Sequence, residues 1–248
     1  MRPNKKLGLL GRNISYSFSR NYFAQKFEKE GLTNDYTYVN FDIPSIAEFK
    51  SVIKNNPDTI GMNVTIPYKE EVIPFLDQLS ENAKAIGAVN TIKVLTDGKL
   101  EGHNTDYFGF TESLKPLLKS HHKKALILGT GGAAKAIAFG LQLLGIEYQY
   151  VSRKASEKTI PYENIDQQIF SKHTLIINCT PLGTSPNIEA CPDIPYEFFT
   201  EGHIAYDLIY NPEETEFLKR AKQKKAVTKN GYEMLVLQAE KAWKIWTD

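Results

Sequence analysis

Residues 125–134 read Ala-Leu-Ile-Leu-Gly-Thr-Gly-Gly-Ala-Ala, and this stretch decides the fold. Ala125–Leu128 is a continuous apolar run, as expected of a strand buried on both faces of a parallel sheet. The glycine-rich turn after it fits the pattern Gly-x-Gly-x-x-Gly/Ala and opens a stretch over 132–144 that predicts a helix. A strand, a glycine loop and a helix in this order predict a Rossmann-type dinucleotide site.

The small residues of this loop have separate physical tasks. Gly129 permits the tight turn, Gly131 lets the backbone approach a pyrophosphate, and Ala134 keeps the helix close to the strand. Backbone amides at the start of a helix attract an anion. We therefore expect this loop to bind a cofactor. A plain strand-to-helix turn would have a similar composition, but the flanking elements favour a dinucleotide.

The end of the next strand indicates which dinucleotide binds. NAD sites usually carry an acidic residue there to hold the ribose diol. Here the strand ends in Ser152-Arg153-Lys154, with no acid. A guanidinium can grip a 2′-phosphate and stack on adenine, whereas a carboxylate would repel the phosphate. By itself this segment would suit a solvated basic turn; its place after the glycine loop favours NADP over NAD.

The pattern of short apolar runs extends along the whole chain. Runs at 7–10, 36–41 and 59–64 alternate with amphipathic stretches, and the alternation restarts after Asp106. This predicts an α/β fold with mostly parallel strands. We expect two α/β domains with a boundary near residue 106.

Composition excludes several classes of function. The 248 residues are 42% hydrophobic and 24% charged with a net charge of +1, so bulk charge favours neither nucleic acid nor an anionic membrane. No apolar run approaches the roughly 20 residues of a membrane span. Residues 1–6 lack a signal-peptide core, and Cys179 and Cys191 have no metal-ligand spacing. We expect a cytoplasmic protein without a bound metal.

Two polar segments carry candidate chemistry. Residues 61–69 read Gly-Met-Asn-Val-Thr-Ile-Pro-Tyr-Lys, and residues 101–106 read Glu-Gly-His-Asn-Thr-Asp. A lysine and an aspartate combined with a dinucleotide site suggest hydride transfer coupled to proton transfer. Taken singly, Lys69 could be a surface lysine, and Asp106 could cap the helix that follows.

Many ordered motifs resemble those of the shikimate dehydrogenases. Besides the glycine loop, the segments that carry the resemblance are 15–17 (Ser-Tyr-Ser), 63–69, 87–91 (Gly-Ala-Val-Asn-Thr), 102–106, 178–183 (Asn-Cys-Thr-Pro-Leu-Gly), 206–212 (Tyr-Asp-Leu-Ile-Tyr-Asn-Pro), and 230–231 through 238–239. The resemblance implies NADPH-dependent reduction of 3-dehydroshikimate to shikimate, in chorismate and aromatic amino acid biosynthesis. It also implies two α/β domains around a cleft. Residues 1–105 with 231–248 would form the substrate-binding and catalytic domain, and 106–230 the Rossmann-type NADP-binding domain.

The same resemblance implies the site residues. Lys69 and Asp106 would form the catalytic pair. The side chains implied around the substrate are Ser15, Ser17, Thr65, Lys69, Asn90, Asp106, Tyr210 and Gln238. The cofactor contacts implied are Gly129, Thr130, Gly131, Gly132 and Ala133 in the glycine loop, and Glu81, Ser152, Arg153, Lys154, Leu208 and Gly231 elsewhere. The family usually has Asn-Arg-Thr at the end of the second strand, where this chain has Ser-Arg-Lys at 152–154. This departure bears on how strongly NADP is preferred over NAD.

Two alternatives stay open at this point. A quinate or quinate/shikimate dehydrogenase using NAD(P) would share the lysine–aspartate pair and would need extra room beside Ser15 and Ser17. A non-catalytic metabolite-binding paralogue would not need Lys69 or Asp106. A methylene-tetrahydrofolate dehydrogenase fits less well, because the hydroxyl and amide side chains suit a polyol rather than a pterin. The expected partner is a small-molecule substrate, and the chain would be a monomer or homodimer.

Overall fold

The computed structural model describes residues 5–15, 18–154 and 156–248. The chain folds into a first compact unit, Met1–Thr105 with Gln238–Asp248, and a second unit, Asp106–Leu237. Each unit holds one six-stranded sheet with helices, so the expected α/β class with two units is confirmed.

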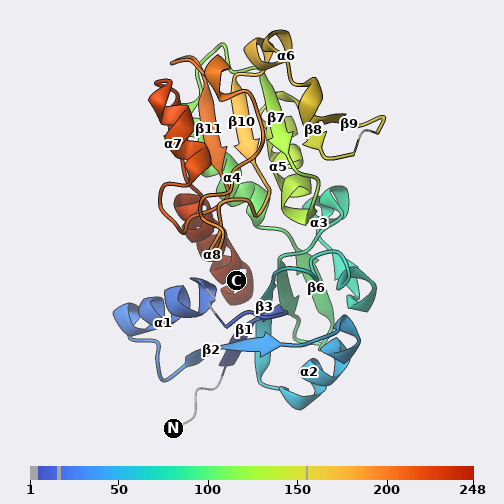
Figure 1. Ribbon diagram of the computed structural model, residues 1–248. Helices are drawn as coiled ribbons and strands as arrows, with labels where there is room; N and C mark the ends of the chain where they lie inside the picture. Colours follow the sequence, from blue (N-terminus) through green and yellow to red (C-terminus); the bar gives the residue numbers. More distant parts are fainter. Residues whose placement is uncertain (1–4, 16–17, 155) are drawn as a thin grey trace. The chain divides into compact units, whose positions relative to one another are not determined.

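The first unit is built on a mixed sheet (Figure 1). Its strand order is β2-β1-β3-β5-β6-β4, with β1 parallel to β2 and β3 and with β5 antiparallel to β3 and β6. The strands are β1 (Lys5–Gly11), β2 (Tyr36–Asp42), β3 (Thr59–Val64), β4 (Gln78–Leu79), β5 (Thr91–Val94) and β6 (Leu100–His103). The helices are α1 (Phe18–Glu30), α2 (Phe49–Asn55) and α3 (Glu81–Ile86), with 3-10 turns at Ile46–Glu48 and Ile73–Phe75.

Side chains alternate between the two faces of this sheet, because successive strand residues point in opposite directions. On β1, Leu10 packs with Phe49 of α2, whereas Leu9 packs with Phe23 of α1 and with Trp246 near the chain end. Both faces are therefore apolar and covered by helices.

The second unit contains a fully parallel sheet of order β12-β11-β10-β7-β8-β9 (Figure 1). Counted from β7 as strand one, this is the order 3-2-1-4-5-6 of dinucleotide-binding folds. The strands are β7 (Lys124–Leu128), β8 (Glu147–Ser152), β9 (Thr159–Pro161), β10 (Leu175–Asn178), β11 (Ile204–Asp207) and β12 (Val227–Lys229). The helices are α4 (Asp106–Leu114), α5 (Gly132–Leu143), α6 (Gln167–Lys172) and α7 (Glu216–Gln223), with 3-10 turns at Lys115–Leu117, Tyr162–Asn164 and Tyr196–Phe198. The last helix, α8 (Tyr232–Thr247), begins in this unit.

The apolar run at 125–128 is buried on both faces, as its composition predicts. Ile127 packs with Phe110 of α4 and Ile137 of α5, and Leu128 packs in the opposite core with Phe170 of α6. In the parts that the structure describes, no helix has both the length and the apolar character of a membrane span.

The change of unit near the C-terminus falls inside a helix. The second compact unit runs to Leu237, and the first unit takes up the chain again at Gln238, inside α8. Met234, in the first turn of α8, packs in a core of the second unit, and Ala242 packs in a core of the first unit. A continuous helix thus contributes one end to each core.

Candidate active site

Lys69 follows β3 in a turn whose backbone is held on several sides. The N–H of Thr65 donates to Leu10 O (2.9 Å), and the N–H of Val89 donates to Lys69 O (2.7 Å). Tyr68 is 1% exposed and donates its hydroxyl to Ile43 O (2.7 Å). This buried tyrosine anchors the turn, and Lys69 lies half-buried directly after it.

The loop that carries Ser15 runs beside this turn. A Cβ added to Gly11 would lie 2.6 Å from Thr65 Cγ2, so the two segments are in close contact. Asp42 holds the loop by accepting the N–H of Ile14 at 3.1 Å. Ser15 is exposed at its end. Ser17, the other predicted serine, lies outside the described residues.

Asn90 and Gln238 meet in a buried polar cluster. Asn90 Nδ2 donates to Gln238 Oε1 (3.4 Å) and to Thr105 Oγ1 (3.0 Å), and Asn90 Oδ1 accepts the N–H of Thr105 at 2.7 Å. Asn90, Thr105 and Gln238 are at most 5% exposed. Burial and mutual hydrogen bonds hold both carboxamides in place, which is what recognition of a polyol requires.

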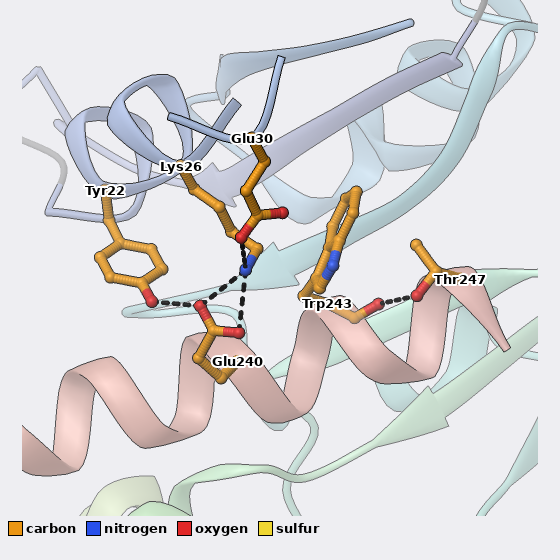
Figure 2. Close-up of polar contacts among 6 residues, drawn as sticks. All are labelled: Tyr22, Lys26, Glu30, Glu240, Trp243 and Thr247. Atoms are coloured by element: carbon orange, nitrogen blue, oxygen red, sulfur yellow. Dashed lines mark hydrogen bonds and ion pairs between the residues drawn. The ribbon is translucent and has the colours of Figure 1, made fainter. Parts of the chain in front are cut away.

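The helix that carries Gln238 is bound to α1 by an ion-pair cluster, which Figure 2 shows. Lys26 Nζ contacts both carboxylate oxygens of Glu240 at 3.0 Å and Glu30 Oε1 at 2.8 Å, and Tyr22 also donates to Glu240. Burial alone lowers the pKa of Lys26, but its bonds to the two carboxylates outweigh this and raise the pKa. Lys26 also lies 5.7 Å from the ring centroid of Trp243. These directional contacts limit rotation of α8 about its axis.

In the second unit, the turn after β7 has the shape that a pyrophosphate needs. Gly129 has a φ of 106°, which favours glycine. A Cβ on Gly131 would meet no heavy atom within 4 Å, so the space beside the backbone is open. The N-terminus of α5 has no side-chain cap at Gly131, so its first amides are not satisfied by a capping side chain. The glycine loop therefore fits a dinucleotide on local geometry.

The segment after β8 is basic and solvent-facing. Arg153 and Lys154 are exposed, and Ser152 Oγ accepts the N–H of Lys154 at 3.4 Å. Because β8 is the neighbour of β7, this segment lies at the same edge of the sheet as the glycine loop. Two exposed cations at this edge suit a 2′-phosphate.

A buried carboxyl group organises the ends of β10 and β11. Asp207, which is 0% exposed, accepts hydrogen bonds from Thr215 Oγ1 (2.6 Å), the N–H of Ile209 (3.0 Å) and Asn178 Nδ2 (3.1 Å). Burial raises its pKa to about 6, although these three bonds favour the ionised form. Asp207 therefore shapes the turn that carries Leu208 and Tyr210.

Leu208 is pressed against a second backbone segment. A Cβ on Gly231 would lie 2.1 Å from Leu208 O, and Gly231 N–H donates to Ile209 O at 3.0 Å. Only glycine allows this approach, which explains why the segment before α8 has a glycine there.

The raised pKa of Asp207 leads us to expect a specific pH dependence of the protein's stability. Its folded-state pKa lies above the unfolded value of about 3.9, so the folded protein holds the proton more tightly. The stabilisation from this group is fully present below about pH 4 and is lost as the pH rises through its folded pKa of about 6. Relative to wild type, Asp207→Asn should gain roughly 3 kcal/mol in unfolding free energy between pH 4 and pH 7. Urea unfolding at several pH values across this range measures the unfolding free energy of both proteins. If this free energy depends on pH in the same way in wild type and Asp207→Asn, the expectation is contradicted.

Comparison with known proteins identifies the family. The family model for the shikimate dehydrogenase substrate binding domain matches residues 9–92. The NADP(+) shikimate dehydrogenase of Caldicellulosiruptor saccharolyticus is 37% identical, and the alignment covers 98% of this chain and 92% of that protein. The chain belongs to the shikimate dehydrogenase family.

Solved structures with the same fold include other members of this shikimate dehydrogenase family. Shikimate 5-dehydrogenase of Thermus thermophilus, solved with NADP(H) and shikimate, is 32% identical with a TM-score of 0.86, covering 98% of this chain and 93% of its own. A quinate dehydrogenase of Corynebacterium glutamicum, solved with NAD, is 26% identical with a TM-score of 0.86, covering 99% and 94%. Since the fold is shared by proteins named for different substrates, side chains must decide which substrate is used.

The structure of this shikimate dehydrogenase family member distributes the expected residues over both units. The first unit holds Ser15, Thr65, Lys69, Asn90 and Gln238, and also Glu81, which is exposed at the start of α3. The second unit holds Asp106 and Tyr210 together with the glycine loop and the basic segment. Asp106 is 6% exposed and begins α4, so the expected position at a helix start is met.

Sequence reasoning missed three buried partners of the predicted residues. Thr105 and Thr91 contact Asn90, and Asn63 contacts Thr91. All three stand inside the motifs that carry the family resemblance, and Thr91 and Thr105 directly adjoin the predicted residues Asn90 and Asp106. A polar, uncharged side chain inside such a motif was the signal that could have identified them as partners of the site residues.

Proposed function

We propose that this chain catalyses the reversible reduction of 3-dehydroshikimate to shikimate with NADPH. The observation that carries the proposal is the retention of Lys69 and Asp106, in a chain of this family, at the positions where the family has its acid–base pair. A buried cluster of amides and hydroxyls around Asn90, in the same unit as Lys69, supports a polyol as the substrate.

Lys69 is assigned the proton transfer. When bound, NADPH supplies the hydride that adds to the carbonyl carbon of the substrate. Negative charge then develops on the carbonyl oxygen, and the ammonium of Lys69 stabilises this charge and donates the proton that completes the hydroxyl. The carboxylate of Asp106 is assigned the orientation of Lys69 and a hydrogen bond to the same hydroxyl. Hydride and proton together convert the ketone into the alcohol, and oxidation runs the same steps in reverse.

The polar side chains around this pair are assigned the binding of the substrate. Hydroxyl and amide groups can bond both a carboxylate and ring hydroxyls. A site built in this way rejects analogues that lack a hydroxyl, because its buried polar groups would then be unpaired. The residues assigned to the substrate are Ser15, Ser17, Thr65, Asn90, Tyr210 and Gln238.

NADP is assigned to the carboxyl edge of the sheet in the second unit. The open space at Gly131, the amides at the start of α5 and the switch in strand order between β7 and β10 support a pyrophosphate there. Arg153 and Lys154 are assigned to the 2′-phosphate. The remaining contacts are assigned to Glu81, Ser152, Leu208 and Gly231.

Replacement of Arg153 should change cofactor choice. In Arg153→Ala we expect the ratio of kcat/KM for NADPH over NADH to fall by roughly 10- to 100-fold, because a charge-assisted bond to the 2′-phosphate is lost. The loss should appear in KM for NADPH, with NADH kinetics unchanged. Arg153→Lys is the matched control and should recover only part of the ratio, since an ammonium lacks the planar fork. An unchanged ratio in Arg153→Ala would remove this residue from the 2′-phosphate site.

The direct test of the function is a spectrophotometric assay. Shikimate with NADP should produce reduced nicotinamide, and quinate or NAD in place of either component should give a lower rate. Faster oxidation of quinate with NAD would favour a quinate dehydrogenase. Binding of shikimate and NADP without turnover would favour a metabolite-binding paralogue, in which Lys69 and Asp106 have no catalytic task.

The cellular setting and assembly are also proposals. The two cysteines, Cys179 and Cys191, are free thiols, which supports a reducing compartment such as the cytoplasm. We propose a monomer or a homodimer, which analytical ultracentrifugation would distinguish. Within the described residues, no three His, Cys, Asp or Glu side chains are grouped to hold a metal ion.

A further inference from the structure

A buried chain of hydrogen bonds crosses the first unit and ends at the two carboxamides of the candidate site. Tyr38 Oη donates to Asn63 Oδ1 (2.7 Å), and Asn63 Nδ2 donates to Thr91 Oγ1 (3.3 Å). Thr91 Oγ1 then donates to Asn90 Oδ1 (3.0 Å), and Asn90 Nδ2 donates to Gln238 Oε1 (3.4 Å). All five side chains are buried. Each side chain donates a hydrogen bond to the next one, so all four hydrogen bonds run in the same donor-to-acceptor direction, from Tyr38 to Gln238.

Main-chain groups determine this direction. Asn90 Oδ1 accepts the N–H of Thr105 at 2.7 Å, and Asn63 Nδ2 donates to the carbonyl oxygen of Asn90 at 3.3 Å. A main-chain N–H can only donate, and a main-chain carbonyl can only accept. Neither carboxamide can therefore turn over without losing a main-chain bond. Asn90 must direct its nitrogen toward Gln238, which in turn directs its oxygen toward Asn90.

Thr91 links the two asparagines of this chain. It lies on β5, is 0% exposed, and stands opposite Asn63 of β3 in the antiparallel register. Its hydroxyl accepts from Asn63 and donates to Asn90, and it also lies 3.3 Å from Thr105 Oγ1. A buried network specifies one arrangement only while its members are satisfied. Removal of this hydroxyl would leave Asn90 Oδ1 with one donor fewer and Asn63 without this acceptor.

We propose that Thr91 is a positioning residue, whose hydroxyl acts with the main-chain N–H of Thr105 to hold the carboxamide oxygen of Asn90 inside the protein. Asn90 Nδ2 then fixes the oxygen of Gln238, so that Gln238 meets a substrate hydroxyl through its Nε2 donor. This inference rests on the proposed function and specifies which end of a carboxamide, the N–H donor or the oxygen acceptor, faces the substrate. As an N–H donor, Gln238 selects a substrate that presents an oxygen atom able to accept a hydrogen bond. A substrate without that oxygen leaves buried N–H groups unpaired and is rejected.

The test compares Thr91→Val with Thr91→Ser in the full chain. Valine has nearly the shape of threonine without its hydroxyl, whereas serine keeps the hydroxyl. With shikimate and NADP we expect Thr91→Val to raise KM for shikimate by about 10- to 100-fold, because Asn90 Oδ1 is then held by Thr105 alone and the paired carboxamides of Asn90 and Gln238 are less firmly oriented. KM for NADP should stay unchanged and kcat should change by less than about 3-fold, and Thr91→Ser should stay within about 3-fold of wild type.

A matched control separates positioning from loss of stability. Thr111→Val, in α4, removes a buried hydroxyl that donates to Phe108 O at 3.1 Å, in the second unit. It should lower Tm as Thr91→Val does and leave KM for shikimate unchanged. An equal rise in KM for both variants, or no rise in Thr91→Val, would overturn the proposal. If Thr91→Val does not fold, Thr91→Ala against Thr91→Ser makes the same comparison.

Substrate discrimination gives a readout that stability alone would not move. Wild type should prefer shikimate over a shikimate analogue without one ring hydroxyl, and for one such analogue Thr91→Val should reduce that preference at least about 10-fold. An unchanged preference for every monodeoxy analogue would contradict the donor role assigned to Gln238. If wild type does not oxidise shikimate, the proposed function fails by itself. Shikimate binding by calorimetry to wild type and Thr91→Val would then still decide the positioning role.

Discussion

Lys69→Met should lower kcat for shikimate oxidation by about 10²- to 10⁴-fold, the range expected when a general acid–base group is lost. Methionine keeps the length and apolar stem of the side chain but has no proton to donate. The turn around Lys69 is held by main-chain bonds and by the buried Tyr68, so the fold should survive the change. KM for NADP should stay near the wild-type value. Steady-state kinetics with both substrates would measure these effects.

Two further variants sharpen the interpretation of Lys69. Lys69→Arg keeps a positive charge, but the guanidinium does not release its proton near neutral pH. It should bind shikimate better than Lys69→Met and still react slowly, which would separate charge stabilisation from proton transfer. Lys54→Met, at an exposed position of α2, is the control for removal of one cation and should react at the wild-type rate. A wild-type rate in Lys69→Met would remove Lys69 from the chemistry.

Gly131→Val should abolish NADP binding while leaving the protein folded. Gly131 has φ −72° and ψ −179°, a conformation open to any residue, and an added Cβ meets no heavy atom within 4 Å. The space that valine would fill is the space assigned to the pyrophosphate. We expect Kd for NADP to rise by more than about 100-fold, because the backbone amides can no longer reach the phosphates. Titration calorimetry would measure the affinity, and thermal unfolding without cofactor should give an unchanged Tm.

A second glycine provides the contrast to Gly131. In Gly231→Ala the new Cβ would lie 2.1 Å from Leu208 O, so this variant should lose stability even without cofactor. Gly131→Ala should fall between wild type and valine in affinity, since a methyl group fills less of the space. Normal NADP affinity in Gly131→Val would place the cofactor elsewhere.

Much of the second unit could be predicted from local sequence. The apolar run at 125–128, the glycine loop and the following helix are contiguous, and each is specified by neighbouring residues. The cations at Arg153 and Lys154 follow the next strand, and the parallel β7–β8 pairing brings them to the edge that the loop occupies. Such predictions succeed because strand, turn and helix signals act over a few residues.

The polar arrangement in the first unit was less accessible to sequence reasoning. Asn90 and Gln238 were expected in one pocket only through family resemblance, and their hydrogen bond joins positions 148 residues apart. The bond between Lys26 and Glu240 spans 214 residues and had no sequence signal. Threonines in these motifs looked like turn or strand residues, because their partners are distant in the chain.

The sequence by itself determined the class of fold, the dinucleotide loop and the type of residue available for proton transfer, since all three depend on composition and short-range order. Only the tertiary structure decided which polar atoms face one another. Sheet register sets Thr91 against Asn63, and packing of the last helix brings Gln238 to Asn90. These contacts depend on long-range packing, and a hydrogen-bond direction becomes defined only when its distant partner is in place.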